Sequence, residues 1–396
     1  MRELGIGIAA ILALMIGVGA LDRGPDAHDI ALAPRPPNPA RFGSDENPSW
    51  GPAFDMIALI YLTEAREDRH HLPSLKQRLD EALEAMDTRT NRTDEVRGRV
   101  MPGWGNRHYS AGLRHAWMVH AAILARPMVE FARLARLDPH AAPELTAAAG
   151  RYLDTAQAIV EAYARDARWD GEHLYYVFPE EWRSVDCEAA RDVKKCMHYR
   201  SLAGTPLPFN MIHAMGTLML ALRAADPARF DFRREIIGMA KHFRAHLALV
   251  GCERIGCPYG PQRFYTWRYL IGGRKEDVSH AGQSIGFVTG VVETGLGIFG
   301  REDLRRFANT FLVAVTKGAD LASLDAVNGI AYHVDGSGKV ESQHKTACIR
   351  WLPLAATEPR IARLCEAIYH ANRLTRGVRA KAYFGRFVPE PAGAAS

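Results

Sequence analysis

The 396-residue sequence lacks the short motifs that identify many common enzyme classes. It contains no phosphate-binding glycine-rich loop, no nucleophile elbow, no HExxH pair and no EF-hand loop. It also lacks a strong excess of either charge, because its net charge is only +5. This balance gives no reason to expect nucleic acid as a partner, but it is compatible with an acidic substrate. We therefore predict no cofactor and no metal.

Long apolar runs are scarce as well, and the only one covers residues 4–21. Arg2 precedes the run, and Val18 and Ala20 form a small-x-small pattern that is typical of a signal-peptidase site. We expect residues 1–21 to be a signal peptide, with a membrane anchor through 4–21 as the alternative. Either interpretation places the rest of the chain outside the cytoplasm, in the periplasm or secreted.

Cysteine is infrequent, and no two cysteines form a CxxC pair, which disfavours zinc. The six cysteines fall into three local groups: Cys187 with Cys196, Cys252 with Cys257, and Cys348 with Cys365. Sequence alone cannot choose the pairing. In an oxidising compartment, three local disulfides are the simplest arrangement.

Proline-rich composition delimits one domain. Residues 22–49 read as an extended linker or arm, and residues 389–396 as a disordered tail. Between them, residues 50–388 carry apolar side chains at helical spacing. We expect helices at about 52–67, 72–87, 111–136, 143–167, 207–225, 231–249, 278–299, 301–317, 344–356 and 359–376.

The connections between these helices alternate in length. Short turns with stop and start signals, such as Asp138-Pro139 and Asp226-Pro227, join the two helices of each pair. The long connections span 88–110, 168–206, 250–277 and 318–343. The pattern predicts an all-α fold of about five to six helical hairpins with every long loop at one end. The irregular spacing favours an α/α toroid, as an incomplete or closed double ring, over an open superhelix.

Aromatic and polar residues gather where the first helix of each pair begins. Sugars are bound by aromatic faces and by forked polar groups, so a cleft lined in this way suits a glycan. The candidate substrate-binding residues are Trp104, Asn106, Arg107, His108, Tyr109, His213, Tyr265, Trp267, His344 and Trp351. The alternative is that the aromatic side chains cap the core.

The densest motif runs from Trp267 to His280. The candidate catalytic residues are Arg268, Tyr269, Glu276, Asp277 and His280, together with Asn210 from another segment. Acid, base, cation and phenol within 14 residues shift one another's pKa values, as active sites require. A structural network is the alternative, with Asp277 as a helix cap and Glu276 paired with Arg268.

A second group follows Trp104. His115 and His120 are five residues apart, which disfavours a zinc pair on one helix face. His120 lies in an apolar stretch, so we expect it to be a hydrogen-bonded core histidine. His108 and Tyr109 precede the helix and are the stronger candidates for substrate binding. Asn210 and His213 are three apart and share a helix face.

The layout of residues 50–376 resembles the α/α-toroid carbohydrate enzymes, which include alginate-lyase-like polysaccharide lyases and six-hairpin glycosidases and epimerases. The resemblance implies an enzyme that acts on a polysaccharide by β-elimination or epimerisation, with a uronate-containing polymer as the candidate substrate. In such lyases an Asn or Arg neutralises the uronate carboxylate, while Tyr and His transfer protons.

Two alternatives stay open. A glycoside hydrolase would use Glu276 or Asp277 with a second carboxylate across the scissile bond, for which the 168–206 loop offers Glu180, Glu181 and Asp186. A non-catalytic glycan-binding protein of the cell envelope would use the same aromatic residues without turnover. All three interpretations name a polysaccharide or oligosaccharide as the partner.

Overall fold

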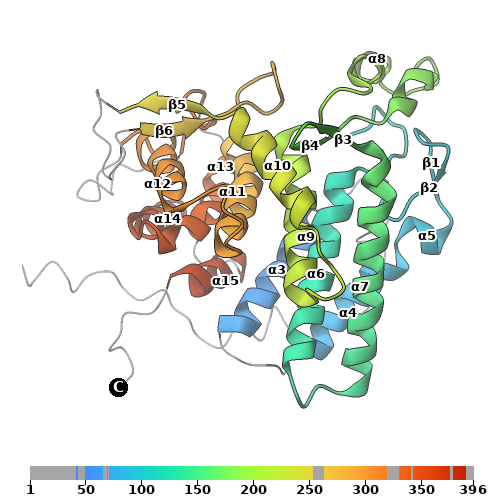
Figure 1. The fold of residues 1–396 in the computed structure, drawn as a ribbon, viewed down its shortest axis with the longest axis horizontal. Coiled ribbons are helices and arrows are strands. Elements are labelled where there is room, and N and C mark those ends of the chain that lie inside the picture. Colours follow the sequence, from blue (N-terminus) through green and yellow to red (C-terminus); the bar gives the residue numbers. More distant parts are fainter. Residues whose placement is uncertain are drawn as a thin grey trace, which may run out of the picture.

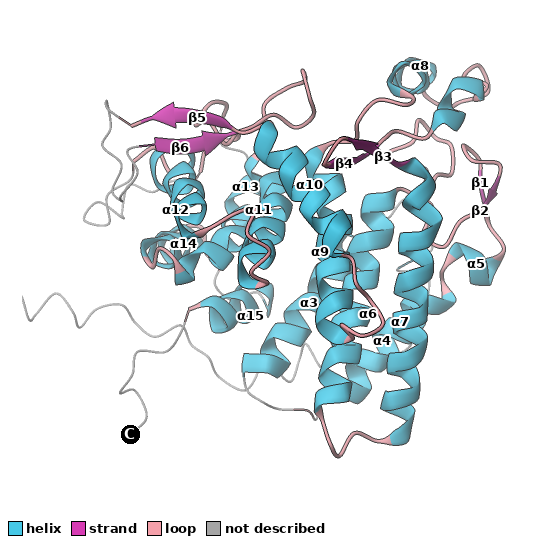
Figure 2. Ribbon diagram, in the orientation of Figure 1, coloured by secondary structure: helices cyan, strands magenta, loops and turns pink. Residues whose placement is uncertain are grey.

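The computed structural model describes residues 42, 50–65, 69, 71–252, 263–318, 330–339, 342–374 and 378–388. The described chain is mostly helical, with a few short strands (Figures 1 and 2). The expected signal peptide or anchor, the tail and nearly all of the proline-rich arm lie outside these residues. Within them, no helix is both long enough and apolar enough to cross a membrane.

The first helices of the predicted pairs are apolar on nearly every side, which is why they are buried. They are α3 (Trp50–Ala65), α6 (Met118–Leu137), α9 (Phe209–Ala225), α11 (Val278–Glu293), and the short α13 (Ser342–Lys345), which continues into the 3₁₀ helix η6 (Thr346–Ala356). We call α3, α6, α9, α11 and η6 the inner helices.

The second helices carry apolar residues on one face only and pack on the inner helices. They are α4 (Leu72–Glu84), α7 (Pro143–Tyr163), α10 (Arg233–Ala245), α12 (Arg301–Asn309) and α14 (Arg360–Ala371). A π-helical segment, Thr310–Val315, extends α12. The predicted alternation of short turns and long connections is present in this order.

The inner helices contact one another in a cyclic order. α3 packs on α6, α6 on α9, α9 on α11, and α11 on η6. A further helix, α15 (Val378–Phe387), packs on both η6 and α3 and completes the cycle. The helical periodicity that we used ends near residue 376, so α15 was not predicted.

The long connections contain short antiparallel hairpins and helices, most of them at the upper end of the view in Figure 1. The strands are β1 (Thr93–Asp94) with β2 (Arg99–Val100), β3 (Ala167–Asp170) with β4 (His173–Tyr176), and β5 (Ala248–Gly251) with β6 (Arg263–Thr266). The short helices are α5 (Asp87–Thr90), η2 (Ala164–Asp166), η3 (Glu180–Ser184) and α8 (Val193–Leu202).

Three predicted helix ends are wrong for local reasons. The helix expected from residue 111 begins at Met118, because Ala111 and Gly112 adopt positive φ angles of 59° and 88° in a tight turn. The helix expected to reach residue 249 ends at Ala245, because β5 begins three residues later. The helix expected to reach residue 299 ends at Glu293, just before Gly295, which has φ 67°.

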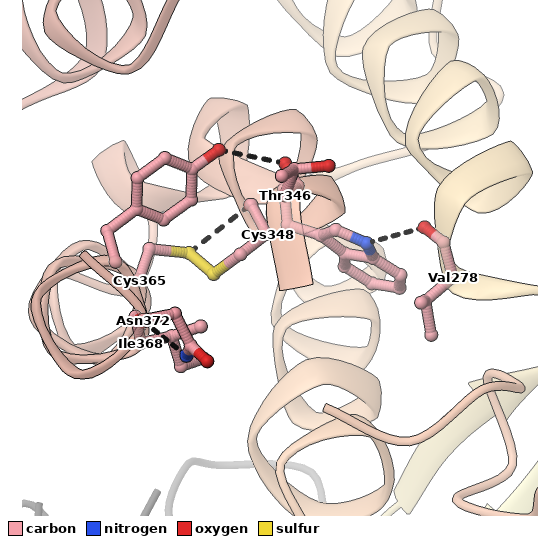
Figure 3. Close-up of a disulfide and its surroundings, with 8 residues drawn as sticks. Val278, Thr346, Cys348, Cys365, Ile368 and Asn372 are labelled. Atoms are coloured by element: carbon pink, nitrogen blue, oxygen red, sulfur yellow. Dashed lines mark hydrogen bonds between the residues drawn. A yellow bond between two sulfur atoms is a disulfide. The ribbon is translucent and has the colours of Figure 1, made fainter. Parts of the chain in front are cut away.

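Two of the three expected disulfides are confirmed. Cys187–Cys196 attaches the preceding loop to α8, and Cys348–Cys365 joins η6 to α14 (Figure 3). The third expected pair involves Cys257, which lies outside the described residues. Two disulfides in one chain indicate an oxidising, extracellular-type environment.

Candidate functional site

Five rings from separate segments meet where the inner helices begin. We call Trp50, Tyr109, His120, Tyr269 and His280 the loop-end cluster. The Trp50 ring centroid lies 5.8 Å from that of His120 and 6.3 Å from that of His280. Tyr109 lies 5.6 Å from His120, and Tyr269 lies 5.3 Å from His280. Long loops and helix starts more than 200 residues apart therefore converge in one place.

On one side of the cluster, His280 is held by the residue that caps α11. One carboxylate oxygen of Asp277 accepts hydrogen bonds from the backbone N–H groups of Ser279 and His280. The other oxygen lies 2.6 Å from Nδ1 of His280. Burial alone would raise the pKa of Asp277, but its contacts with His280 outweigh burial and lower the pKa to about 2. Asp277 is therefore a permanent anion beside the imidazole, and its predicted capping role is confirmed.

Glu276 lies directly behind this pair and is fully buried. One of its oxygens accepts from the backbone N–H of Asp277, and the other has no hydrogen-bond partner. Burial, followed by the negative charge of Asp277, raises the pKa of Glu276 well above its usual value and so favours its protonated form. The alternative pairing of Glu276 with Arg268 is wrong, because Arg268 is exposed and donates to the carbonyl of Gly273 instead.

Tyr269 is carried by a tight hairpin that brings an unexpected cation to the site. Gly272, with φ 70°, turns the chain, and the backbone N–H of Tyr269 donates to the carbonyl of Arg274. The Arg274 guanidinium then lies 4.8 Å from the centroid of the Tyr269 ring. Arg274 is exposed and forms no ion pair with any residue that the structure describes. Burial, with Glu276 adding to it, raises the pKa of Tyr269, so the phenol stays protonated.

On the other side of the cluster, His120 has a neutral partner. Nδ2 of Asn106 lies 3.0 Å from Nδ1 of His120, and the histidine is only 3% exposed. Burial lowers the pKa of His120 to about 3, and the nearby His115 and His108 act in the same direction. The prediction of a hydrogen-bonded, buried His120 is confirmed, although its ring also faces Trp50 and Tyr109.

Tyr109 forms the accessible rim of the cluster, with 39% of its surface exposed. Its backbone carbonyl accepts a 2.6 Å hydrogen bond from the Tyr199 hydroxyl. Tyr199 lies on α8, which the Cys187–Cys196 disulfide restrains. His108 is exposed and packs edge-on against Tyr109 at 4.6 Å. Sequence reasoning did not single out Tyr199, since it lies inside a long loop with no distinguishing motif.

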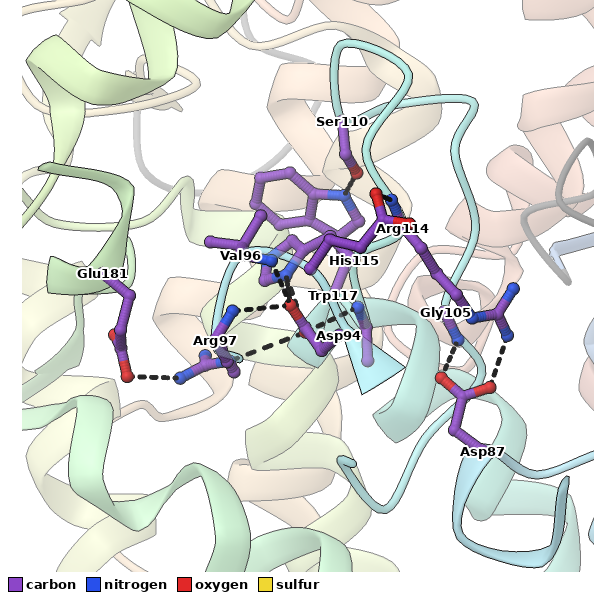
Figure 4. A network of polar contacts seen from close by, with 12 residues as sticks. Asp87, Asp94, Val96, Arg97, Gly105, Ser110, Arg114, His115, Trp117 and Glu181 are labelled. Carbon is purple, nitrogen blue, oxygen red and sulfur yellow. Dashed lines mark hydrogen bonds and ion pairs between the residues drawn. The ribbon is translucent and has the colours of Figure 1, made fainter. Parts of the chain in front are cut away.

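A buried polar network shapes the loop that presents Asn106 and Tyr109 (Figure 4). Asp94 accepts from the backbone N–H groups of Val96, Arg97 and Ala116 and lies 2.8 Å from Nδ1 of His115. A second pair, Asp87 with Arg114, anchors the same loop, and Asp87 also accepts from the backbone N–H of Gly105. Arg107, expected to bind substrate, forms an ion pair with Glu95.

Four aromatic residues expected to contact substrate lie in the core instead. They are Trp104, Trp267, Trp351 and Tyr265, each 6% exposed or less. Trp104 and Trp351 donate to the backbone carbonyls of Ala82 and Val278, and Tyr265 donates to Asp303. Buried rings offer no surface to a ligand, so the alternative that aromatic side chains cap the core holds for these four.

The remaining predicted residues lie around the cluster at different depths. His213 is fully buried between Phe243 and Phe287, and burial lowers its pKa well below the usual value, so it is a core residue. Asn210 is 1% exposed, and its Oδ1 has no hydrogen-bond partner. It lies next to Phe209, whose N–H donates to the carbonyl of Tyr269. His344 is 2% exposed, with Nε2 3.9 Å from Oδ1 of Asp277.

The same residues offer two kinds of chemistry. The ligand atoms of Glu276, Asp277 and His280 lie within 4.8 Å of one another, so these three side chains form a group that could hold a metal ion. Acid–base chemistry fits the donors better, because Asp277 already accepts two backbone hydrogen bonds and burial favours the protonated form of Glu276. The exposed side of the cluster then combines an imidazole, a protonated phenol and a guanidinium.

Comparison of the chain with protein-family models, with curated proteins and with solved structures returned no match. Function is therefore argued from the geometry of the site alone.

Proposed function

We propose that this protein is an exported enzyme that removes the proton beside the carboxylate of a uronate-containing polysaccharide, by β-elimination or epimerisation. One observation carries the proposal: the imidazole of His280 and the exposed guanidinium of Arg274 both contact the ring of Tyr269, whose phenol is protonated. This is the set of groups that such a proton transfer needs.

The fold supports the same proposal. The cyclic order of contacts from α3 through η6 and α15 is what a closed α/α toroid requires, with the second helices as its outer layer. In that architecture the loop-end cluster occupies the middle of one rim. The disulfides support an exported protein, and we assign it to the periplasm or the extracellular space.

The reaction follows from the charges at the site. The Arg274 guanidinium pairs with the substrate carboxylate and makes the neighbouring C–H more acidic. Nδ1 of His280 faces Asp277, so His280 takes that proton through Nε2. Asp277 then stabilises the imidazolium that forms. In elimination, the electron pair forms the new C=C bond, the C–O bond to the leaving sugar breaks, and the Tyr269 hydroxyl protonates the leaving oxygen. In epimerisation, the C–O bond stays intact, and the Tyr269 hydroxyl instead protonates the same carbon from the face opposite His280.

Trp50 and Tyr109 give this site its contacts with sugar rings. Trp50 is partly exposed, lies between the two histidines, and can pack against the C–H face of a sugar. Tyr109 offers the same kind of surface at the rim. Both take the role that sequence reasoning gave to the buried tryptophans.

Hydrolysis has weaker support, because it needs two carboxylates that reach the scissile bond. Asp277 is 5% exposed and bound to the helix start, and Glu276 is fully buried. Of the candidates in the 168–206 loop, Glu180 pairs with Arg183 and Glu181 with Arg165. Asp186, the third candidate of that loop, is exposed and accepts a hydrogen bond from the backbone N–H of Glu188.

The test is incubation of the purified protein with alginate, pectate and hyaluronan while near-ultraviolet absorbance and reducing ends are recorded. Elimination raises both signals, whereas hydrolysis raises only reducing ends. Epimerisation raises neither signal but changes the uronate composition of the polymer. Binding without any of these changes would support the glycan-binding alternative and reject our proposal.

A matched pair of variants connects the activity to the site. Tyr269→Phe removes the proposed proton donor, so we expect turnover to fall about 100-fold or more. Tyr109→Phe removes a rim hydroxyl of the same type that no step uses, and we expect turnover within about threefold of wild type. Equal effects of the two substitutions would exclude Tyr269 as the acid.

A further inference from the structure

A cavity of about 370 Å³ lies between the inner helices and α15. All six elements contribute to its lining, which begins at Phe54, four residues after Trp50, and at Gly282, two residues after His280. None of the five residues of the loop-end cluster lines it. The residues that matter here are Phe54, Tyr61, Arg126, Gln283, Arg350 and Tyr383. Its volume is at the lower end of the about 300–1,000 Å³ typical of small-molecule sites.

Two buried polar side chains in this cavity lack a protein partner. Gln283 is 9% exposed and Tyr383 is 7% exposed. Neither side chain hydrogen-bonds to any residue in the part of the chain that the structure describes. The polar atoms of both side chains remain open to the cavity, whereas Nε of Arg126 is enclosed without a hydrogen-bond partner. These groups can therefore form hydrogen bonds with a ligand that enters the cavity.

Two guanidinium groups beside them lack a close carboxylate. Arg126 donates to the Tyr61 hydroxyl, and the nearest oxygen of Glu130 is 3.9 Å away. Arg350 donates to Ser279 and lies over the Phe54 ring at 4.3 Å, with no ion pair to a described residue. Both cations interact with the Tyr383 phenol, so the three groups are neighbours.

The two cations differ from the other arginine pairs of this cavity. Arg133 forms ion pairs with Glu64 and Glu130, and Arg386 lies 3.2 Å from Glu64. Those charges are matched within the protein. Glu293 also lines the cavity and interacts with Arg126, and burial raises its pKa. The four lining arginines still outnumber the three lining glutamates, and a single anionic group would stabilise the extra positive charge.

The glycines of α11 open the space for these groups. A Cβ atom on Gly282 would lie 2.4 Å from Cβ of Arg350, so glycine lets that arginine pass close to the helix. One turn on, a Cβ on Gly286 would meet no atom within 4 Å, because this residue borders the cavity itself. A larger side chain at Gly286 therefore enters the cavity without a clash.

We propose that this cavity binds a small hydroxylated carboxylate of about monosaccharide size. The carboxylate lies between Arg126 and Arg350, the Tyr383 hydroxyl and the Gln283 amide provide hydrogen bonds, and the Phe54 ring contacts the carbon skeleton. This site is separate from the loop-end cluster, and the proposal does not depend on the catalytic function above.

Isothermal calorimetry of the full-length protein with D-glucuronate tests the proposal, with glucose as the neutral probe of nearly the same shape. We expect glucuronate to bind and glucose to bind at least about tenfold more weakly, because the charge-assisted hydrogen bonds are lost. Equal affinity for the two sugars, or no binding of glucuronate, overturns it.

Variants assign any binding to this cavity. Tyr383→Phe and Gln283→Leu remove groups with no partner in the free protein, so we expect each to weaken glucuronate binding about fivefold or more without lowering the unfolding temperature. Gly286→Phe fills the space and abolishes binding, whereas Gly150→Phe, at an open position on α7, does not. His280→Ala separates the two sites, since it leaves this binding unchanged. If His280→Ala abolishes binding while Tyr383→Phe and Gly286→Phe leave it intact, the proposed site does not exist.

Discussion

Two histidines occupy the same position in two helices of this molecule and have different electrostatic environments. His120 is the third residue of α6, His280 is the third residue of α11, and both face Trp50. His120 is buried against the neutral amide of Asn106, and its pKa is lowered to about 3. His280 is 30% exposed at its side chain and lies beside the carboxylate of Asp277.

The difference teaches that the partner and the burial, not the helix position, decide what each imidazole can do. A histidine held neutral by burial does not readily accept a proton. His120 therefore serves to orient Asn106, Tyr109 and Trp50. A histidine next to a permanent anion can accept a proton, because the imidazolium that forms is stabilised. This contrast is the reason that we propose His280, and not His120, as the catalytic base.

The largest expected effect is on turnover at His280. We expect His280→Ala to lower kcat/KM on a uronate polymer by about 10²–10⁴-fold, because a general base is lost. The circular dichroism spectrum should be retained, since the ring is partly exposed. His108→Ala removes an exposed ring close to Tyr109 and serves as the control, with activity within about threefold of wild type. A folded His280→Ala protein with full activity would remove the distinction between the two histidines.

The next effect concerns the cation on the His280 side. Arg274→Gln keeps hydrogen-bonding capacity but removes the charge over Tyr269, so we expect kcat/KM to fall about 10–100-fold. Arg268→Gln is the matched control, because that arginine is in the same hairpin but donates to Gly273. We expect its kcat/KM within about twofold of wild type. The reverse order would return the carboxylate-binding role to Arg268, as sequence reasoning had it.

The smallest expected effect is the loss of folding stability at acidic pH that the buried His120 causes. Its folded pKa is about 3, so below the ordinary histidine value of 6.5 the unfolded chain binds a proton that the folded chain does not. Stability therefore falls as pH decreases from about 6.5 to 3, by on the order of 1 kcal/mol per pH unit from this residue. His120→Gln should flatten urea-unfolding stability over that window relative to wild type. His280→Gln instead removes the contact that lowers the Asp277 pKa, so its destabilising effect should be fully present above about pH 4 and disappear as the pH falls toward 2. Identical pH profiles for wild type and His120→Gln would show that His120 is not held neutral.

Much of the fold follows from local patterns. Alternating short and long connectors, the proline turns and the helical periodicity are encoded within short stretches, so the helix order and two local disulfides were predictable. The closing helix α15 was not, because its packing on α3 joins residues more than 300 positions apart. A pattern within ten residues does not indicate which distant helix a segment packs against.

The location of the site could be predicted from the sequence, but not all of the residues that form it. Helix starts could be assigned to one end, which brought Tyr109, Tyr269 and His280 into consideration. Burial depends on neighbours from other segments, so sequence reasoning could not tell the exposed Trp50 from the buried Trp104. Arg274 had one usable signal, the Gly272-Gly273 turn, which folds it back onto Tyr269.

The most direct test of the proposed chemistry is the reaction of a uronate polymer in D₂O, with the products examined by NMR. Removal of the proton beside the carboxylate predicts either unsaturated ends that have lost that hydrogen or intact chains that carry deuterium at that carbon. Cleaved chains that keep the original hydrogen and have saturated ends, or polymers with no change at all, would contradict the account.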